Sequence, residues 1–265
     1  MKRLSSGKNP HLKHLKGLQE KSRLRQQTKS FSVEGEKEIR FAKEGGFVIK
    51  ELFFRADRLE AHSSWVEEYQ NNIPCYTVES PIFESLCYRS NTTTMIAVVE
   101  QKQTALAEIQ MNETPFLLVA ESPEKPGNIG ALLRTVDAVG ADALIIVDPK
   151  TDVYNPNVIR SSVGCLFSVS WACCSKKDFC DFIKAKKIQL LSAALTSAAK
   201  LYTQKDYTKA IAIAVGTEDK GLSDEWLRNS DSQVILPMLG KNDSLNVSVA
   251  AGILMYEARR QRNLG

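Results

Sequence analysis

Short apolar runs, most of them separated by segments of helix length, dominate the second half of the chain. After Thr114 they read PFLLVAE, ADALIIVD, SVSWACC, IQLLSAAL, AIAIAVG and SQVILPM. Runs that are apolar on both faces are typical of parallel strands with helices on each side of the sheet. We therefore predict an α/β fold with a parallel sheet over residues 114–265.

The first hundred residues alternate helix-like and strand-like patterns on a smaller scale. Strand patterns occur in FVIKELFF, PCYTVE and TTTMIAVVE. Helical periodicity is expected in four segments: Pro10–Gln27, Ser32–Lys43, Ser63–Gln70 and Pro81–Tyr88. We predict a small α/β domain over residues 1–100, followed by a polar linker over residues 101–113.

Positive charge is concentrated at the start of the chain. Residues 1–30 contain nine Lys or Arg and one Glu, whereas the formal net charge of the whole chain is +4. A basic block of this kind is suited to the phosphate backbone of a nucleic acid. Leu12, Leu15 and Leu18 recur at helical spacing, so the same charges also fit the solvated face of an amphipathic helix. The two interpretations are compatible.

The composition excludes several kinds of site. No apolar run is long enough to span a bilayer, and the basic N-terminus lacks the apolar core of a secretory signal. The cysteines form no CxxC pair, so we expect a cytoplasmic protein with reduced thiols. No histidine follows His62, which excludes imidazole-based catalysis confined to the C-terminal domain and argues against a His-rich metal site.

Polar residues follow the predicted strands, where ligands of open α/β sheets bind. Asn128 is expected either to cap the helix after LLVAE or to contact a ligand. Arg134 lies about two turns later on an apolar helix, and either a salt bridge or an anionic ligand would account for it. Glu218, after AIAIAVG, is either a first-turn carboxylate favoured by the helix dipole or a site residue. The glycine fingerprints of dinucleotide and nucleoside triphosphate sites are absent, which disfavours a nucleotide-binding oxidoreductase.

The segment GKNDSLNVSVAAGILMYE, residues 240–257, has a polar first half and an apolar second half. Asp243 or Ser244 is expected to cap the last helix, but one cap needs a single polar side chain. Ser244 and Asn246 point in nearly opposite directions, as expected between a ligand and a partner surface. Val249–Tyr256 is apolar on all sides, which predicts burial against its own sheet and a second element such as another subunit.

Three segments, in this order, resemble the SpoU (TrmH-like) branch of the SPOUT RNA methyltransferases. They are NIGALLRTVDAVGAD, IAVGTEDKGLS and VILPMLGKNDSLNVSVAAGILMYE, and NPNVIRSSVG falls where the family has a similar helix. The N-terminal KNPHLKHLKGLQEKSRLRQQTKSFSVEGEKEI resembles the small α/β RNA-binding module often fused ahead of this catalytic domain. NTTTMIAVV departs from the form with Gln and Gly that is common there.

The resemblance implies a parallel-sheet SPOUT domain whose C-terminal segment forms a deep trefoil knot, preceded by a small RNA-binding domain. It implies that S-adenosylmethionine is the cofactor, held in the knot largely by backbone groups. It also implies a homodimer through the first-motif and C-terminal helices, with no metal and no membrane. The positions that match the family's cofactor contacts are Leu195, Thr196, Gly216, Leu236, Leu245 and Val247.

The implied reaction is methyl transfer to a ribose 2′-hydroxyl of RNA. Ribosomal RNA is preferred, because the extra N-terminal domain is typical of the ribosomal enzymes. Arg134 would engage the substrate phosphate and assist activation of the 2′-hydroxyl, usually across the dimer interface. The positions that would orient it are Asn128, Glu218, Ser244 and Asn246. The expected RNA contacts in the basic block are Lys13, Lys16, Arg23 and Arg25. Two alternatives stay open: a transfer RNA 2′-O-methyltransferase, and a non-catalytic RNA-binding or ribosome-assembly factor.

Overall fold

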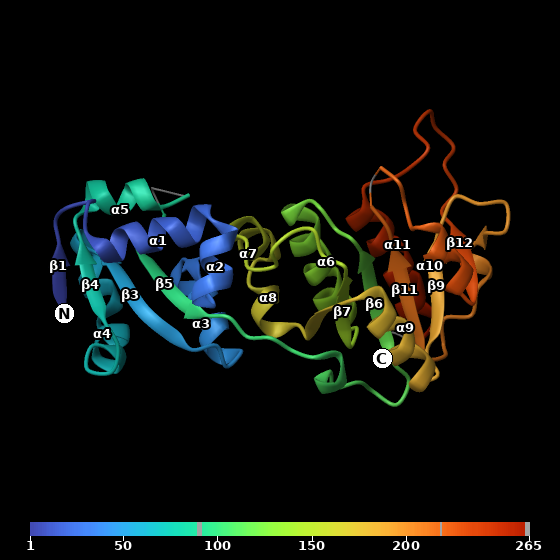
Figure 1. The fold of residues 1–265 in the computed structure, drawn as a ribbon, viewed down its shortest axis with the longest axis horizontal. Coiled ribbons are helices and arrows are strands. Elements are labelled where there is room, and N and C mark those ends of the chain that lie inside the picture. The colour runs from blue at the N-terminus through green and yellow to red at the C-terminus, as the bar shows by residue number, and fades with distance from the viewer. Residues whose placement is uncertain (89–91, 218, 263–265) are drawn as a thin grey trace. The chain divides into compact units, whose positions relative to one another are not determined.

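The computed structural model describes residues 1–88, 92–217 and 219–262, and the chain divides into two compact units (Figure 1). The first unit comprises Met1–Lys102 and Tyr154–Ile159, and the second comprises Gln103–Val153 and Arg160–Gly265. Tyr154 belongs to the first unit because its ring stacks on Phe31 at 4.4 Å and its hydroxyl accepts a hydrogen bond from the Lys102 backbone N–H at 2.9 Å.

The first unit is built on a mixed five-stranded sheet with the strand order β1-β4-β3-β5-β2. Strand β5 is antiparallel to both of its neighbours, and the other pairs are parallel. The strands are β1 (Lys2–Leu4), β2 (Ser30–Glu34), β3 (Ile49–Arg55), β4 (Cys75–Val78) and β5 (Met95–Glu100). The helices are α1 (Pro10–Glu20), α2 (Ser22–Thr28), α3 (Glu36–Glu44), α4 (Ser63–Tyr69) and α5 (Ser80–Leu86), with a 3-10 helix at Ala56–His62. Helices α1 and α5 share one apolar cluster with strands β3, β4 and β5.

Two of the predicted helices are wrong in detail. The helix predicted from Ser32 begins only at Glu36, because SFSVE forms strand β2 with Phe31 and Val33 buried. The long helix predicted from Pro10 is interrupted at Lys21, whose backbone is extended. In both places tertiary packing overrides the local periodicity.

The second unit contains a seven-stranded sheet with the order β10-β12-β9-β11-β6-β7-β8, in which every pair is parallel. This confirms the parallel sheet predicted from the apolar runs, while the short edge strand β10 has no counterpart in the prediction. The strands are β6 (Phe116–Glu121), β7 (Ala143–Val147), β8 (Trp171–Cys174), β9 (Gln189–Ala193), β10 (Lys200–Leu201), β11 (Ile211–Val215) and β12 (Ser232–Ile235).

Helices cover both faces of this sheet (Figure 1). Helices α9 and α10 share one apolar cluster with the sheet, in which the rings of Phe179 and Trp226 stack at 5.4 Å. Helices α6 and α11 pack against each other, α6 on β7 and α11 on β11. The helices of this part of the chain are α6 (Pro126–Val139), α7 (Pro156–Ser162), α8 (Cys165–Ser168), α9 (Lys176–Ala185), α10 (Asp224–Asn229) and α11 (Val247–Gln261).

The predicted linker packs partly on the second unit. It contains the 3-10 helix Leu106–Glu108, and Ile109 is buried in the cluster under α9 and α10. No helix among the described residues combines the length and apolar character needed to cross a bilayer.

Candidate active site

The carboxyl edge of the second sheet gathers the loops that contain most of the predicted site residues. Strands β6, β9, β11 and β12 run parallel, so the segments that follow them emerge at the same edge. Five of the six cofactor positions predicted from sequence lie in the loops after β9, β11 and β12, and the sixth, Val247, begins α11. Asn128 lies in the helix after β6. The topology therefore collects residues that are far apart in sequence.

Asn128 and Asn246 meet at this edge. The side-chain Nδ2 of Asn246 donates a hydrogen bond to Oδ1 of Asn128 at 3.3 Å. Asn128 does not cap α6, since the capping residue is Lys125 and Pro126 begins the helix. The capping interpretation of Asn128 is therefore wrong. Its side chain instead contacts the start of another helix.

Asn246 also caps α11. Its Oδ1 accepts hydrogen bonds from the backbone N–H of Ser248 at 2.9 Å and from the Ser248 hydroxyl at 2.6 Å. The expected caps, Asp243 and Ser244, lie before the helix begins, and the Ser244 hydroxyl donates to Oδ1 of Asp243 at 3.3 Å. The side chain of Asn246 therefore has two roles. Its Oδ1 accepts from the first turn of α11, and its Nδ2 donates to Asn128 on α6.

Arg134 lies on the same helix as Asn128 and is exposed. Its side chain forms no hydrogen bond or ion pair with any other described residue, so the structure does not contain the salt bridge considered as an alternative. A guanidinium without an internal partner is available to an external anion.

The predicted cofactor positions combine exposed apolar side chains with tightly packed backbone. Leu195 is 61% exposed and Leu245 is 38% exposed, although leucine side chains are usually buried. Leu236 and Val247 are half-buried, and the Thr196 hydroxyl donates to the side-chain oxygen of Gln233. Glu218, the remaining predicted site residue, lies outside the described residues.

Gly216 shows why the turn after β11 requires glycine. A Cβ at this position would lie 2.0 Å from the carbonyl carbon of Gly221 and 2.3 Å from the backbone nitrogen of Leu222. Two backbone hydrogen bonds of 3.0 Å also join Thr217 and Gly221. These contacts close the turn on itself, so the backbone groups of Gly216, Thr217 and Gly221 are held in a fixed position. Apolar side chains and ordered backbone groups suit an adenosyl group, which needs both.

Comparison with known proteins agrees with the family resemblance of the three sequence segments. The profile of the SpoU rRNA methylase family matches residues 115–256. This chain belongs to the SpoU rRNA methylase family. A second profile, that of the MRM3-like substrate binding domain, matches residues 9–97.

Members of the SpoU family resemble this chain over different lengths. A 23S rRNA guanosine 2′-O-methyltransferase of Bacillus subtilis is 29% identical over 98% of this chain and 100% of its own length. A tRNA guanosine 2′-O-methyltransferase of Thermus thermophilus is 35% identical over 62% of this chain and 84% of its own length. The AdoMet-bound structure of an rRNA methyltransferase from Sinorhizobium meliloti is 28% identical, covers 97% of each chain and has a TM-score of 0.88.

The basic block that precedes the SpoU domain differs from the prediction at one residue. Lys13, Lys16 and Arg23 are exposed, as RNA-contacting residues need to be. Arg25 is only 2% exposed, and its guanidinium donates to the backbone carbonyl of Leu18 at 2.7 Å. Arg25 is thus a buried residue that holds α1 against α2, and the assignment of an RNA contact to it is corrected.

One polar network of the SpoU domain has no counterpart in the sequence prediction. Glu121, at the end of β6, is buried and accepts hydrogen bonds from Lys176 and Ser223. Burial alone would raise the pKa of Glu121, but these hydrogen bonds outweigh it and hold the pKa below its usual value. The only signal in the sequence is a carboxylate at the end of an apolar run, PFLLVAE.

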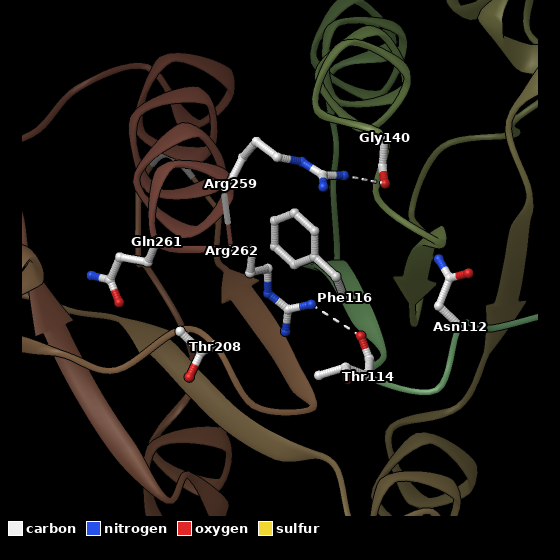
Figure 2. Close-up of a pocket in the computed structure, with 8 residues that line it drawn as sticks. All are labelled: Asn112, Thr114, Phe116, Gly140, Thr208, Arg259, Gln261 and Arg262. Carbon is white, nitrogen blue, oxygen red and sulfur yellow. Dashed lines mark hydrogen bonds between the residues drawn. The ribbon is translucent and has the colours of Figure 1, made fainter. Parts of the chain in front are cut away.

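A pocket lies beside the opposite, amino-terminal ends of β6 and β11 (Figure 2). Arg262 donates to the carbonyl oxygens of Thr114 and Tyr207 at 3.0 and 2.7 Å, and its guanidinium lies 4.7 Å from the ring centre of Phe116. Arg259 donates to the Gly140 carbonyl at 2.7 Å. These guanidinium groups are largely occupied by backbone carbonyls, so they fasten the end of α11 to the sheet.

Across residues 1–88, 92–217 and 219–262, His, Cys, Asp and Glu side chains do not converge in groups of three that would hold a metal ion.

Proposed function

We propose that this chain transfers a methyl group from S-adenosylmethionine to a ribose 2′-hydroxyl of ribosomal RNA. The observation that carries the proposal is the meeting of Asn128 and Asn246 at the carboxyl edge of a SpoU-family sheet. Ribosomal RNA is favoured over transfer RNA because the ribosomal relative aligns with 98% of this chain, including its first unit, whereas the tRNA relative aligns with 62%.

S-adenosylmethionine would supply an electrophilic methyl group on its sulfonium. In this chain, Leu195 and Leu245 would cover its apolar surfaces, and the closed turn at Gly216 would present backbone donors and acceptors. Thr196, Leu236 and Val247 complete the proposed cofactor positions. We also infer that residues 236–247 thread the trefoil knot, an inference supported by the similarity of the whole fold to the AdoMet-bound relative.

The 2′-hydroxyl has to lose its proton as it attacks the methyl group. The SpoU domain has no histidine to accept it, so the proton would pass to water as the methyl–sulfur bond breaks, and other groups must lower the barrier. The exposed guanidinium of Arg134 would bind the substrate phosphate and stabilise charge near the hydroxyl. Asn128, Ser244, Asn246 and Glu218 would hold the ribose in line with the methyl group, where orientation supplies much of the acceleration.

The outer face of α11 supports a homodimer. Val249, Ile253 and Tyr256 recur at helical spacing and are 50%, 37% and 53% exposed, while the other face of the helix packs on α6. Neighbouring exposed apolar side chains are common at protein–protein interfaces. The predicted burial of the whole segment is therefore not complete within one chain, and we propose that a second copy covers it through α6 and α11. Arg134 would then serve the partner's site.

We place this activity in the cytoplasm. The six cysteines are free in the structure, as expected for a reducing compartment, and ribosomal RNA is available there.

Methyl transfer to purified ribosomal RNA with labelled S-adenosylmethionine tests the proposal. Arg134→Ala should abolish transfer while leaving the affinity for S-adenosylmethionine, measured by calorimetry, unchanged. Arg228→Ala removes an exposed arginine from α10 and serves as the matched control, with transfer retained. A wild-type protein that binds RNA but transfers no methyl group would favour the non-catalytic assembly factor. Transfer to tRNA alone would favour the tRNA enzyme.

A further inference from the structure

A buried carboxylate ties the loop between β11 and α10 to the end of β6. Glu121 is the last residue of β6 and is 6% exposed. Its Oε2 accepts a hydrogen bond from the backbone N–H of Ser223 at 2.8 Å. Its Oε1 accepts from the Ser223 hydroxyl at 2.7 Å and from the Lys176 ammonium at 2.8 Å. Three donors therefore converge on one buried side chain.

The side chain of Ser223 contacts Glu121 instead of capping helix α10. It occupies the N-cap position of α10, yet its side chain makes no capping hydrogen bond. A serine cap contributes about 1 kcal/mol, and a buried ion pair is often no more stabilising than well-packed apolar residues. The hydroxyl of Ser223 is instead held by the Glu121 carboxylate and the Lys176 ammonium, which fixes its position.

The position of Ser223 constrains the turn after β11. Leu222 and Gly221 precede it directly, and Gly216 packs against the backbone of both. The two hydrogen bonds between Thr217 and Gly221 close the same turn. A shift of Ser223 would therefore move the backbone around Gly216.

We propose that Glu121 and Lys176 are positioning residues for the S-adenosylmethionine site, which they order through Ser223 and the turn at Gly216. This inference rests on the proposed function, since Gly216 is one of the proposed cofactor positions. Neither Glu121 nor Lys176 needs to touch the cofactor or the RNA. Lys176 keeps the carboxylate ionised and bridges to Glu225 at 3.4 Å, which adds a further link to α10.

The test compares S-adenosylmethionine affinity with the mobility of the loop in the full-length protein. Ser223→Ala removes only the hydroxyl, and Glu121→Gln removes the charge. Each should raise the dissociation constant for S-adenosylmethionine about 10-fold, a usual size for coupling between a site and its support. Each should also speed amide hydrogen exchange between β11 and α10 in the absence of cofactor. The dissociation constant for ribosomal RNA should not change.

Two controls separate positioning from general destabilisation. Ser223→Thr keeps a hydroxyl at an exposed position and should behave as wild type. Arg262→Ala weakens the same domain at the opposite end of the sheet, so it should lower the unfolding temperature without changing S-adenosylmethionine affinity.

Wild-type affinity and exchange in Ser223→Ala would overturn the inference, as would an equal loss of affinity in Arg262→Ala. If Glu121→Gln does not fold, Ser223→Ala decides alone. A wild-type protein that fails to bind S-adenosylmethionine would refute the proposed function itself, independently of the variants.

Discussion

The side-chain amide of Asn246 donates to Oδ1 of Asn128 at 3.3 Å, which joins the start of α11 to the first turn of α6. The two residues are 118 positions apart in sequence. This contact connects two of the three segments that carry the family resemblance, and it gives Asn246 a role beyond helix capping.

The two roles of Asn246 are separable by substitution. Asn246→Ser keeps an N-cap oxygen for Ser248 but is too short to reach Asn128, so stability should be retained and methyl transfer should fall about 100-fold through loss of alignment. Asn246→Ala should lose the same activity and, in addition, about 1 kcal/mol of stability. Urea unfolding and single-turnover methylation measure the two effects. Full activity in Asn246→Ser would show that the contact with Asn128 is not needed.

Close packing between α6 and α7 depends on Gly130. A Cβ at Gly130 would lie 2.7 Å from the Ser162 backbone nitrogen and 2.8 Å from the Ser161 carbonyl carbon, so Gly130→Ala should cost about 1–3 kcal/mol. Gly127 lies on the same helix with no atom within 4 Å of an added Cβ, and Gly127→Ala should be neutral or slightly stabilising. Denaturant midpoints of the two variants check the contrast. Equal midpoints would mean that α6 moves freely away from Ser161 and Ser162.

Acid should weaken the protein through Glu121. Because its pKa is lower in the folded state than the usual value of 4.5, the ionised carboxylate stabilises the fold above that pH, and this contribution is lost as pH falls through the folded-state pKa. Unfolding midpoints should therefore drop below about pH 4.5 in wild type and less steeply in Glu121→Gln. Exposed Glu124, which pairs with Lys150 at 2.7 Å, is the control. Salt should remove the effect of Glu124→Gln but not that of Glu121→Gln.

The basic block should act on RNA through its exposed residues only. Replacing Lys13, Lys16 and Arg23 by glutamine should weaken RNA binding and reduce the slope of log affinity against log salt by about 1 for each phosphate that is no longer neutralised. Arg25→Gln should leave this slope unchanged and lower stability by about 2 kcal/mol, because the Leu18 carbonyl loses a charged donor. Filter binding at several salt concentrations measures the slopes. An unchanged slope in the triple variant would mean that these side chains are only a solvated surface.

The sequence determined the fold class and the family, and the family implies the cofactor and the reaction. Apolar runs such as AIAIAVG predict parallel strands, because a strand covered on both faces removes all of its side chains from water. The positions of charged residues and histidines can also be read directly from the sequence. The motif resemblance led to S-adenosylmethionine and RNA, in agreement with the family match over residues 115–256.

Only the tertiary structure decided which partners the polar residues have. Arg25 looks like any other basic residue in the sequence, yet it is buried because α2 folds back on α1. SFSVE became a strand because β5 was available to pair with it. Asn246, rather than Asp243 or Ser244, caps α11. Glu121 accepts hydrogen bonds from Lys176 and Ser223, which are distant in sequence. Local sequence encodes periodicity and charge, whereas the partner of a hydrogen bond between distant residues exists only once the strands are ordered in the sheet.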